Sequence, residues 1–380
     1  MTSNTDRMSV LYPWWRLVNI KGLGVISQNQ IFDLCTARQF ADLYYQSDRQ
    51  ALLEFGIKAK VLDALFSDDA GLDYGWQQLQ DWCQLNLCGI LFKGDENYPQ
   101  SLAALRDAPL FLFYAGDLSI INTPSIAVVG SRNPSHYGRE QATNLSRQLV
   151  AADWNVVSGL AIGIDGAAHQ GSLRDISGLG NGHSIAVLGS GLNNIYPKRH
   201  LQLAHDIVNN GGLLLSEHLP DDPALARNFP RRNRIVSGLS KGVLVIEAAL
   251  KSGSLITARL AADQGREVFA LPGPVTNPLS RGCHLLIKEG AVLVECVEDI
   301  LTPFGHQLPE LSEQMSAANE ASTSMKDPDD ILSALDTVPV ALDVLVARTG
   351  KDVAWLSQQL MFLELKGKVS QVPGGYIRIA

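Results

Sequence analysis

The stretch SIAVVGSRNPSHYGREQATNLSRQLVAADWNVVSG, residues 125–159, decides the fold. It holds two short apolar runs, SIAVVG (125–130) and WNVVSG (154–159), with a longer segment of helical pattern between them. Short runs that are apolar throughout are typical of strands buried on both faces of a sheet. A strand, a helix and a second strand in this order indicate a parallel pair joined by a crossover helix.

The same alternation continues along the chain. Five further β-rich runs are separated by helical stretches: SIAVLG (184–189), GLLLSE (212–217), GVLVIE (242–247), EVFALP (267–272) and AVLVE (291–295). We therefore expect an α/β domain with a doubly wound parallel sheet. The earlier runs GILFKG (89–94) and LFLFYAG (110–116) are expected to add edge strands or a subdomain.

Other segments flank this domain. Residues 1–70 show helical spacing and predict a small helical bundle, so the α/β domain is expected over 71–303. Residues 304–328 are polar, small and acidic, which predicts a flexible linker. Residues 329–380 give three helical segments and a Pro-Gly-Gly hairpin, the pattern of a winged helix. Its third helical segment carries balanced charges, so a protein-contact or regulatory role is favoured over reading a DNA groove.

Composition excludes several classes of protein. The 380-residue chain is 46% hydrophobic and 18% charged, as in globular proteins, and its formal net charge is -8. It has no apolar run long enough to span a bilayer and no signal-peptide pattern, so a cytoplasmic protein without membrane contact is expected. Its five cysteines form no CxxC pair and its eight histidines no HExxH motif. We therefore expect no metal and no cofactor.

Charge reverses sign in one short stretch. RNFPRRNR (227–234) holds four arginines, and no Asp or Glu lies between Asp222 and Glu247. On an acidic chain, nucleic-acid binding requires such a focused site, which Arg231, Arg232, Asn233 and Arg234 could supply. An Arg-rich helix whose cations are solvated or paired with distant carboxylates is the alternative.

The loops that follow the predicted strands supply further anion-binding groups. In open parallel sheets, ligands collect beyond the carboxyl ends of the strands. Ser131 could cap the next helix there, and Glu217 and Glu247, which end strands, could order arginines. The loop residues singled out at these ends are Gly130, Ser131 and Arg132, then Gly159, then Tyr196 and Lys198, and finally a phosphate-binding loop of Ser252, Gly253, Ser254 and Thr257.

The identity of the anion leaves two functions open. A dinucleotide fits poorly, because GSRNPS replaces GxGxxG after the first strand. A small-molecule enzyme that binds a nucleotide phosphate stays an alternative, since Asp165 and His169 are spaced to form an acid-base pair on one helix. The same pair could simply cap or orient a loop, and no nucleophile, base and orienting group occur together.

Seven motifs occur in the order found in a known family: GSRNPS, VVSGLAIGIDGAAH, GSGLNNIYP, SEH, FPRRNRIVSGLS, EAALKSGSLITA and the PG of ALPG. Over about residues 87–300 the chain thus resembles the DNA-processing protein A (DprA/Smf) family. The resemblance implies an extended Rossmann fold, a sterile-alpha-motif-like (SAM-like) N-terminal domain, and a C-terminal winged helix. It also implies a homodimer and a non-enzymatic protein that holds single-stranded DNA and loads the RecA recombinase in natural transformation.

The resemblance also carries over a DNA pocket. It falls on Gly130, Ser131 and Arg132, on the loop from Asn194 to Lys198, and on Arg231 to Arg234. The arginine-rich stretch and the strand-end loops agree with this, because single strands are held by cations and by bases stacked on aromatic rings. Tyr196 and Phe229 are the available aromatic side chains, although Phe229 could instead be buried. We therefore expect the separate loops to converge on one positively charged cleft.

Overall fold

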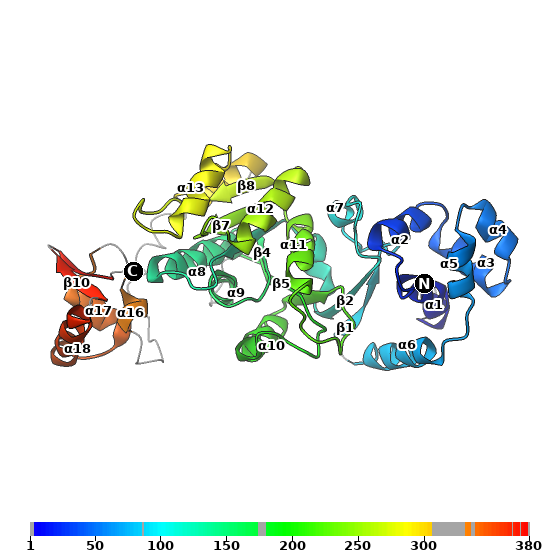
Figure 1. The fold of residues 1–380 in the computed structure, drawn as a ribbon, viewed down its shortest axis with the longest axis horizontal. Coiled ribbons are helices and arrows are strands. Elements are labelled where there is room, and N and C mark those ends of the chain that lie inside the picture. The colour runs from blue at the N-terminus through cyan, green and yellow to red at the C-terminus, as the bar shows by residue number, and fades with distance from the viewer. Residues whose placement is uncertain are drawn as a thin grey trace. The chain divides into compact units, whose positions relative to one another are not determined.

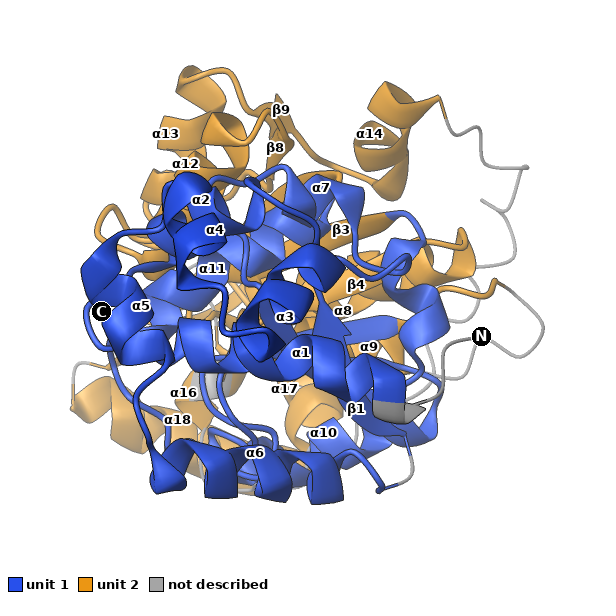
Figure 2. Ribbon diagram, turned by 90° about the vertical axis from the view of Figure 1, so that its right-hand side faces the viewer, with its two compact units in different colours: residues 1–124, 184–240 blue, residues 125–183, 241–380 orange. Residues whose placement is uncertain are grey.

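The computed structural model describes residues 4–85, 87–173, 180–305, 331–335, 339–366, 368–372 and 374–378 (Figure 1). The chain divides into two compact units, coloured separately in Figure 2. Unit 1 comprises residues 1–124 and 184–240, and unit 2 comprises residues 125–183 and 241–380. Each unit therefore contains segments that lie far apart in the sequence.

The strands form a nine-stranded sheet of order β1-β2-β6-β5-β4-β3-β7-β8-β9. Unit 1 holds β1 (Cys88–Phe92), β2 (Phe111–Gly116), β5 (Ser184–Leu188) and β6 (Leu213–Ser216). Unit 2 holds β3 (Ser125–Gly130), β4 (Asn155–Ser158), β7 (Gly242–Ile246), β8 (Glu267–Ala270) and β9 (Val292–Leu293).

Strand direction follows the sequence-based expectation. In unit 2, β4, β3, β7, β8 and β9 are parallel neighbours, and in unit 1 β5 is parallel to β6. The residues of β3 to β7 are nearly all buried, which explains why these strands read as continuous apolar runs. β1 pairs antiparallel with β2, and β2 pairs antiparallel with β6. The mainly parallel sheet is confirmed, and the two early runs extend it with antiparallel strands.

Unit 1 begins with a helical region. Its helices are α1 (Asn4–Val18), α2 (Val25–Phe32), α3 (Ala37–Tyr45), α4 (Arg49–Glu54), α5 (Ala59–Leu65) and α6 (Ala70–Trp82). Trp14 is fully buried and its ring lies 4.3 Å from Phe40 and 5.8 Å from Phe92, measured between centroids. Since Phe92 belongs to β1, this aromatic cluster packs the helical region against the sheet.

The rest of unit 1 surrounds its strands. It comprises α7 (Gln100–Ala103), η1 (Leu118–Asn122), η2 (Lys198–His200), α10 (Leu201–Asn209) and α11 (Asn228–Leu239). α11 contains the arginine-rich stretch. Apolar side chains on one of its faces, Ile235, Val236 and Leu239, are buried.

The sheet of unit 2 packs around a buried apolar core. Its helices are α8 (His136–Ala151), α9 (Ile164–Ser172), α12 (Gly253–Asp263), α13 (Ser280–Lys288), α14 (Val297–Leu301) and η3 (Thr302–Phe304). Side chains of β3, β4, β7 and β8 share this core with residues of α8, α9 and α14. The sheet therefore holds the loops that follow β3, β4 and β7 on a rigid base.

The C-terminal segment of unit 2 is a winged helix, as predicted. It consists of α16 (Ile331–Ala334), α17 (Leu342–Thr349) and α18 (Val353–Leu365), followed by the antiparallel hairpin of β10 (Val369–Val372) and β11 (Gly375–Arg378). Leu345, Leu356 and Leu360 are fully buried in its small core. The predicted linker, residues 304–328, lies from residue 306 onward outside the described residues.

Candidate nucleic-acid interface

The loop after β3 presents an exposed arginine on a tightly constrained backbone. An added Cβ at Gly130 would collide with the carbonyl oxygen of Ile246, so only glycine fits there. The carbonyl oxygen of Ser131 accepts a hydrogen bond from the Ile164 amide at 3.1 Å. Arg132 is exposed, and no carboxylate of the described residues pairs with its guanidinium. The loop thus leaves the Arg132 cation available to an external anion.

The cap of the next helix differs from the prediction. Ser135, rather than Ser131, is the N-cap of α8, and its hydroxyl oxygen accepts a hydrogen bond from the Gly138 amide at 3.0 Å. Ser135 in turn donates to Glu247 from its amide, at 2.8 Å, and from its hydroxyl, at 2.6 Å. Glu247 also accepts from Asn277, so it fixes the start of α8, and among the described residues it pairs with no arginine.

The loop after β4 approaches the β3 loop closely. Gly163 has φ +86°, and an added Cβ would collide with the backbone of Ser131 and Arg132. Asp165, at the start of α9, accepts hydrogen bonds from the amides of Gly159 at 3.1 Å and Ala161 at 3.4 Å. Asp165 and His169 do lie on one helix, and His169 is fully buried. These contacts support the loop-orienting alternative for Asp165 over acid-base chemistry.

The predicted phosphate-binding loop opens α12, as expected from its sequence. Ser252 is the N-cap, and its hydroxyl lies 2.6 Å from the hydroxyl of Ser254. Ser254 and Thr257 are buried, whereas a Cβ added at Gly253 would meet no atom within 4 Å. Because the two serine hydroxyls already bond to each other, a phosphate would reach the backbone near Gly253 more readily than these hydroxyls. Phosphate binding by this loop stays a prediction.

In unit 1, the loop after β5 is tied to the loop after β6. Asn193 donates from its side chain to the Asp221 carboxylate at 2.8 Å, and Asn194 donates to the Asp221 carbonyl oxygen at 2.7 Å. The Ser190 hydroxyl donates to the Asn194 carbonyl oxygen at 2.7 Å. An added Cβ at Gly191 would collide with the carbonyl oxygens of Leu219 and Pro220. Asn194 thus shapes this loop through its bond to Asp221.

The tip of this loop carries an aromatic ring and two cations. Tyr196 is 52% exposed, and its ring centroid lies 5.5 Å from that of Phe229 with the planes 47° apart. Phe229 is half-buried and packs against Gly189. Lys198 and Arg199 are both exposed, and neither pairs with a carboxylate among the described residues. Tyr196 is thus open for stacking, while Phe229 supports it.

The arginines of α11 differ in environment. The side chain of Arg231 is 52% exposed, and its Nε lies 3.3 Å from Glu217. Arg232 is buried and donates from Nη1 to the Val187 carbonyl oxygen and from Nε to Asn233 at 3.4 Å. Arg234 is also buried, with ion pairs to Glu217 at 2.6 Å and Asp107 at 3.1 Å.

The structure confirms pairing with distant carboxylates for part of this arginine-rich stretch, whereas its role in nucleic-acid binding stays a prediction. Arg232 and Arg234 make internal contacts that stabilise unit 1, and Glu217 orders arginines as expected. Arg231 and the exposed Arg227 are the members that solvent reaches. A signal for this division existed, because Arg232 shares a helical face with the apolar residues Ile235, Val236 and Leu239. By contrast, nothing in the sequence indicated that Asp107 would pair with Arg234.

The predicted site residues thus gather in two groups. Unit 1 holds Asn194, Tyr196, Lys198 and the arginines of α11, and unit 2 holds Arg132 with its glycine-rich neighbours. Their convergence into one cleft stays a prediction. In the described ranges, no group of three or more His, Cys, Asp or Glu side chains is arranged to hold a metal ion. None of the described helices has the length and hydropathy needed to cross a bilayer.

Comparison with known proteins agrees with the geometry. Residues 89–305 match the family model of DNA recombination-mediator protein A, and residues 315–375 match the DprA winged helix domain. Protein Smf of Escherichia coli (strain K12) is 48% identical over 288 residues, which cover 75% of each chain. DNA processing protein DprA of Streptococcus pneumoniae is 43% identical over 237 residues, covering 62% of this chain and 78% of the relative.

Solved structures show the same fold. The X-ray structure of DNA processing protein A from Streptococcus pneumoniae superposes with a TM-score of 0.61 at 35% identity, covering 78% of this chain and 97% of that one. The protein from Helicobacter pylori, solved for its single-stranded DNA binding mode, gives a TM-score of 0.50 at 30% identity and covers 57% of this chain and 95% of that one. With these matches over most of its length, the chain belongs to the DprA/Smf family of DNA recombination-mediator proteins.

Proposed function

We propose that this protein binds single-stranded DNA without sequence preference, protects it, and loads the RecA recombinase onto it during natural transformation and homologous recombination. It acts as a homodimer in the cytoplasm and catalyses no chemical step. The Helicobacter pylori relative, described for its single-stranded DNA binding mode, supports the first part. RecA loading and the homodimer rest on the family resemblance.

The observation that carries the proposal is the exposure of cations without internal partners on an acidic chain. Arg132 and Lys198 are exposed, and within the described residues neither is paired with a carboxylate. Since the net charge is -8, each lies in an otherwise unfavourable field for a polyanion, so binding must be local. Tyr196, two residues before Lys198 in the chain and 52% exposed, adds a ring on which a base can stack.

The salt dependence of binding tests the cations. The affinity for a single-stranded homopolymer is measured by fluorescence anisotropy at several salt concentrations for wild type, Arg132→Ala and Lys198→Ala. A variant that makes one phosphate contact fewer should have a log-log slope that is smaller by about 0.7. Lys288→Ala, which removes an exposed and unpaired cation from α13, serves as the matched control. Unchanged slopes for both site variants would exclude this interface.

The aromatic ring is tested separately from the charges. Tyr196→Ala should weaken binding by ~1 to 3 kcal/mol if one base stacks there, with no change in the salt slope. Tyr196→Phe keeps the ring and should bind as wild type does. Stronger binding to duplex than to single strands of the same length would contradict the proposal as a whole.

The recombinase and dimer parts need their own measurements. RecA filament formation on DNA coated with single-strand-binding protein should start sooner when this protein is added, and Arg132→Ala should reduce the gain. Light scattering after size exclusion should give twice the mass of one chain. Loss of DNA binding with an intact dimer would show that the two properties are separate.

A further inference from the structure

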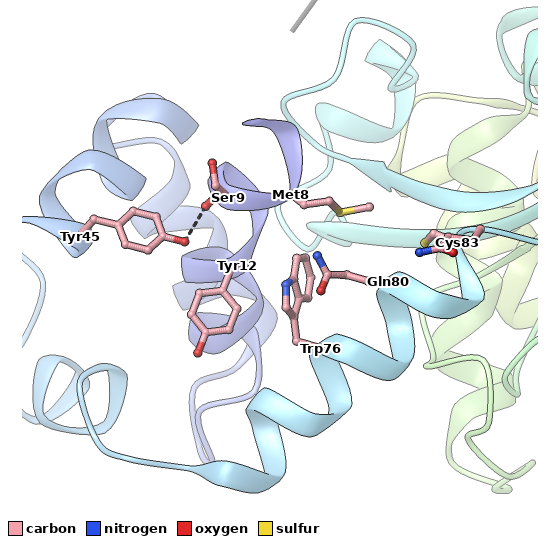
Figure 3. Close-up of a pocket in the computed structure, with 8 residues that line it drawn as sticks. Met8, Ser9, Tyr12, Tyr45, Trp76, Gln80 and Cys83 are labelled. Atoms are coloured by element: carbon pink, nitrogen blue, oxygen red, sulfur yellow. Dashed lines mark hydrogen bonds between the residues drawn. The ribbon is translucent and has the colours of Figure 1, made fainter. Parts of the chain in front are cut away.

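A cavity of ≈ 440 Å³ lies in the helical region of unit 1, between α1, α3 and α6 (Figure 3). It is outside residues 89–305, which match the family model, and its lining residues are not among those assigned to DNA. Its size is in the range of cavities that hold small organic ligands. The lining consists of Met8, Ser9, Tyr12, Tyr45, Trp76, Gln80, Cys83 and Gln84.

Aromatic rings form much of the wall. The Trp76 indole lies 5.8 Å from the Tyr12 ring between centroids, with the planes 60° apart. The Tyr45 hydroxyl donates a hydrogen bond to the Ser9 carbonyl oxygen at 3.1 Å, which fixes a ring that is otherwise 55% exposed. Trp76 is itself buried, so the rings that an incoming ring can contact are those of Tyr12 and Tyr45. The cavity is therefore suited to a planar ligand.

Two carboxamides line the cavity, and neither Gln80 nor Gln84 makes a side-chain hydrogen bond within the described residues. Figure 3 shows the Gln80 carboxamide beside the Trp76 indole. A carboxamide offers an acceptor oxygen and a donor NH₂ side by side. It can therefore bond to a ligand edge that has a donor next to an acceptor, as glutamine does with N6 and N7 of adenine.

The lining is uncharged at neutral pH. Burial raises the pKa of the Cys83 thiol to about 11. Burial, and then the hydrogen bond to Asp73, raise the pKa of Tyr12 to about 12. None of the lining side chains is an acid or base that is ionised at pH 7. The lining therefore offers no ionised partner to a charged ligand.

The surroundings disfavour a phosphate. Residues 1–85 contain seven Lys and Arg but ten Asp and Glu. The arginines on α1 and α3 are already paired, Arg7 with Asp95 at 2.6 Å, Arg16 with Asp73 at 3.2 Å and Arg38 with Asp6 at 2.7 Å. A nucleotide or a DNA strand would thus bring negative charge into an acidic region without an available cation.

We propose that this cavity binds the base of an uncharged purine nucleoside, packed against the rings of Tyr45 and Tyr12 and hydrogen-bonded by Gln80. The site is separate from DNA binding and gives the helical region a small-molecule ligand of its own. Adenosine is the probe, because its N6 and N7 match the carboxamide.

Isothermal titration of the full chain with adenosine tests the proposal. Binding should saturate at one site per chain, and Gln80→Ala should weaken it roughly 5- to 100-fold, the loss expected for one paired base edge. Gln78→Ala, an exposed glutamine on the same helix that does not line the cavity, should bind as wild type does. AMP should bind more weakly than adenosine at low salt, because of its charge.

Three outcomes would overturn the site. These are no saturable binding of adenosine, equal affinity in Gln80→Ala and wild type, or Gln80-dependent binding of an oligonucleotide but not of adenosine. Tyr45→Ala removes an exposed ring and so preserves the core. This second variant should also bind adenosine more weakly than wild type. The affinity for single-stranded DNA should be the same in Gln80→Ala and wild type. A failure of the adenosine site therefore leaves the proposed DNA interface untouched, and the reverse also holds.

Discussion

The carboxylate of Glu217 holds two arginines of α11, and replacing it with glutamine removes the negative charge but keeps the shape. Glu217 has only 7% of its side chain exposed and lies 2.6 Å from Nη2 of Arg234 and 3.3 Å from Nε of Arg231. The side chain of Arg234 is 5% exposed, so it cannot turn to water when the carboxylate is replaced. Glu217→Gln therefore leaves a buried cation only partly neutralised.

The size of the effect follows from what remains around Arg234. Removing one partner of a buried ion pair costs ~3 to 5 kcal/mol when the other charge is left alone. Arg234 keeps Asp107 at 3.1 Å and donates to the carbonyl oxygens of Asp107 at 3.0 Å and Arg231 at 3.2 Å. Since Asp107 is 45% exposed, its charge is screened and compensates incompletely. We expect a loss of about 3 kcal/mol, the lower end of the range.

Native-state amide hydrogen exchange measures this loss where it occurs. A chain with several units does not unfold in one step, so exchange of the α11 amides is a better measure than a global transition. Glu140→Gln is the control, because Glu140 is 51% exposed, belongs to α8 rather than α11, and lies 3.7 Å from His136, which is charged only when it is protonated. If Glu217→Gln changes α11 protection no more than Glu140→Gln does, the pairing contributes little and the reasoning fails.

The same variant separates structure from binding. Arg231 is half-exposed and has one neighbouring negative charge fewer in Glu217→Gln. If Arg231 contacts DNA, the affinity for single strands should rise several-fold while the stability of α11 falls. Arg231→Ala in the Glu217→Gln background should remove the gain. A fall in both properties would instead mean that α11 must be intact for the interface to form.

Two further predictions concern single positions. Burial lowers the pKa of His218, so the unfolded chain binds more protons and stability is lost as pH falls through about 6.5; by amide hydrogen exchange in unit 1, His218→Gln should lose less stability than wild type between pH 7 and 5, and His205→Gln, at an exposed position, should lose as much as wild type. Gly163→Ala places a Cβ against the Ser131 carbonyl oxygen at φ +86° and should lower the free energy of unfolding by ~1 to 3 kcal/mol, whereas Gly253→Ala, with open space, should change it by less than about 0.5 kcal/mol.

Features that depend on neighbouring residues alone were predictable. The strands β3 to β7 are apolar throughout because both faces are covered, so their sequence runs matched the observed bounds within a residue or two. The winged helix was predictable because its helices and hairpin are short and local. The cap of α8 was not, since the choice between Ser131 and Ser135 depends on Glu247, which is 112 residues from Ser135 in the chain.

The arginine-rich stretch shows why a charge pattern cannot by itself identify a binding surface. Consecutive residues of a helix point in different directions, so a run of cations on α11 must divide between solvent and interior. A buried guanidinium is tolerable only with carboxylates or carbonyl oxygens around it, and those partners, Glu217, Asp107 and the Val187 carbonyl oxygen, come from distant segments. The residues available to DNA are then found among those whose cations stay exposed. Arg132 and Lys198 are exposed and unpaired within the described chain and also lie in loops that follow strands of the sheet, a combination that the control cation Lys288 on α13 lacks. This combination is stricter evidence for an interface than the number of arginines in a run.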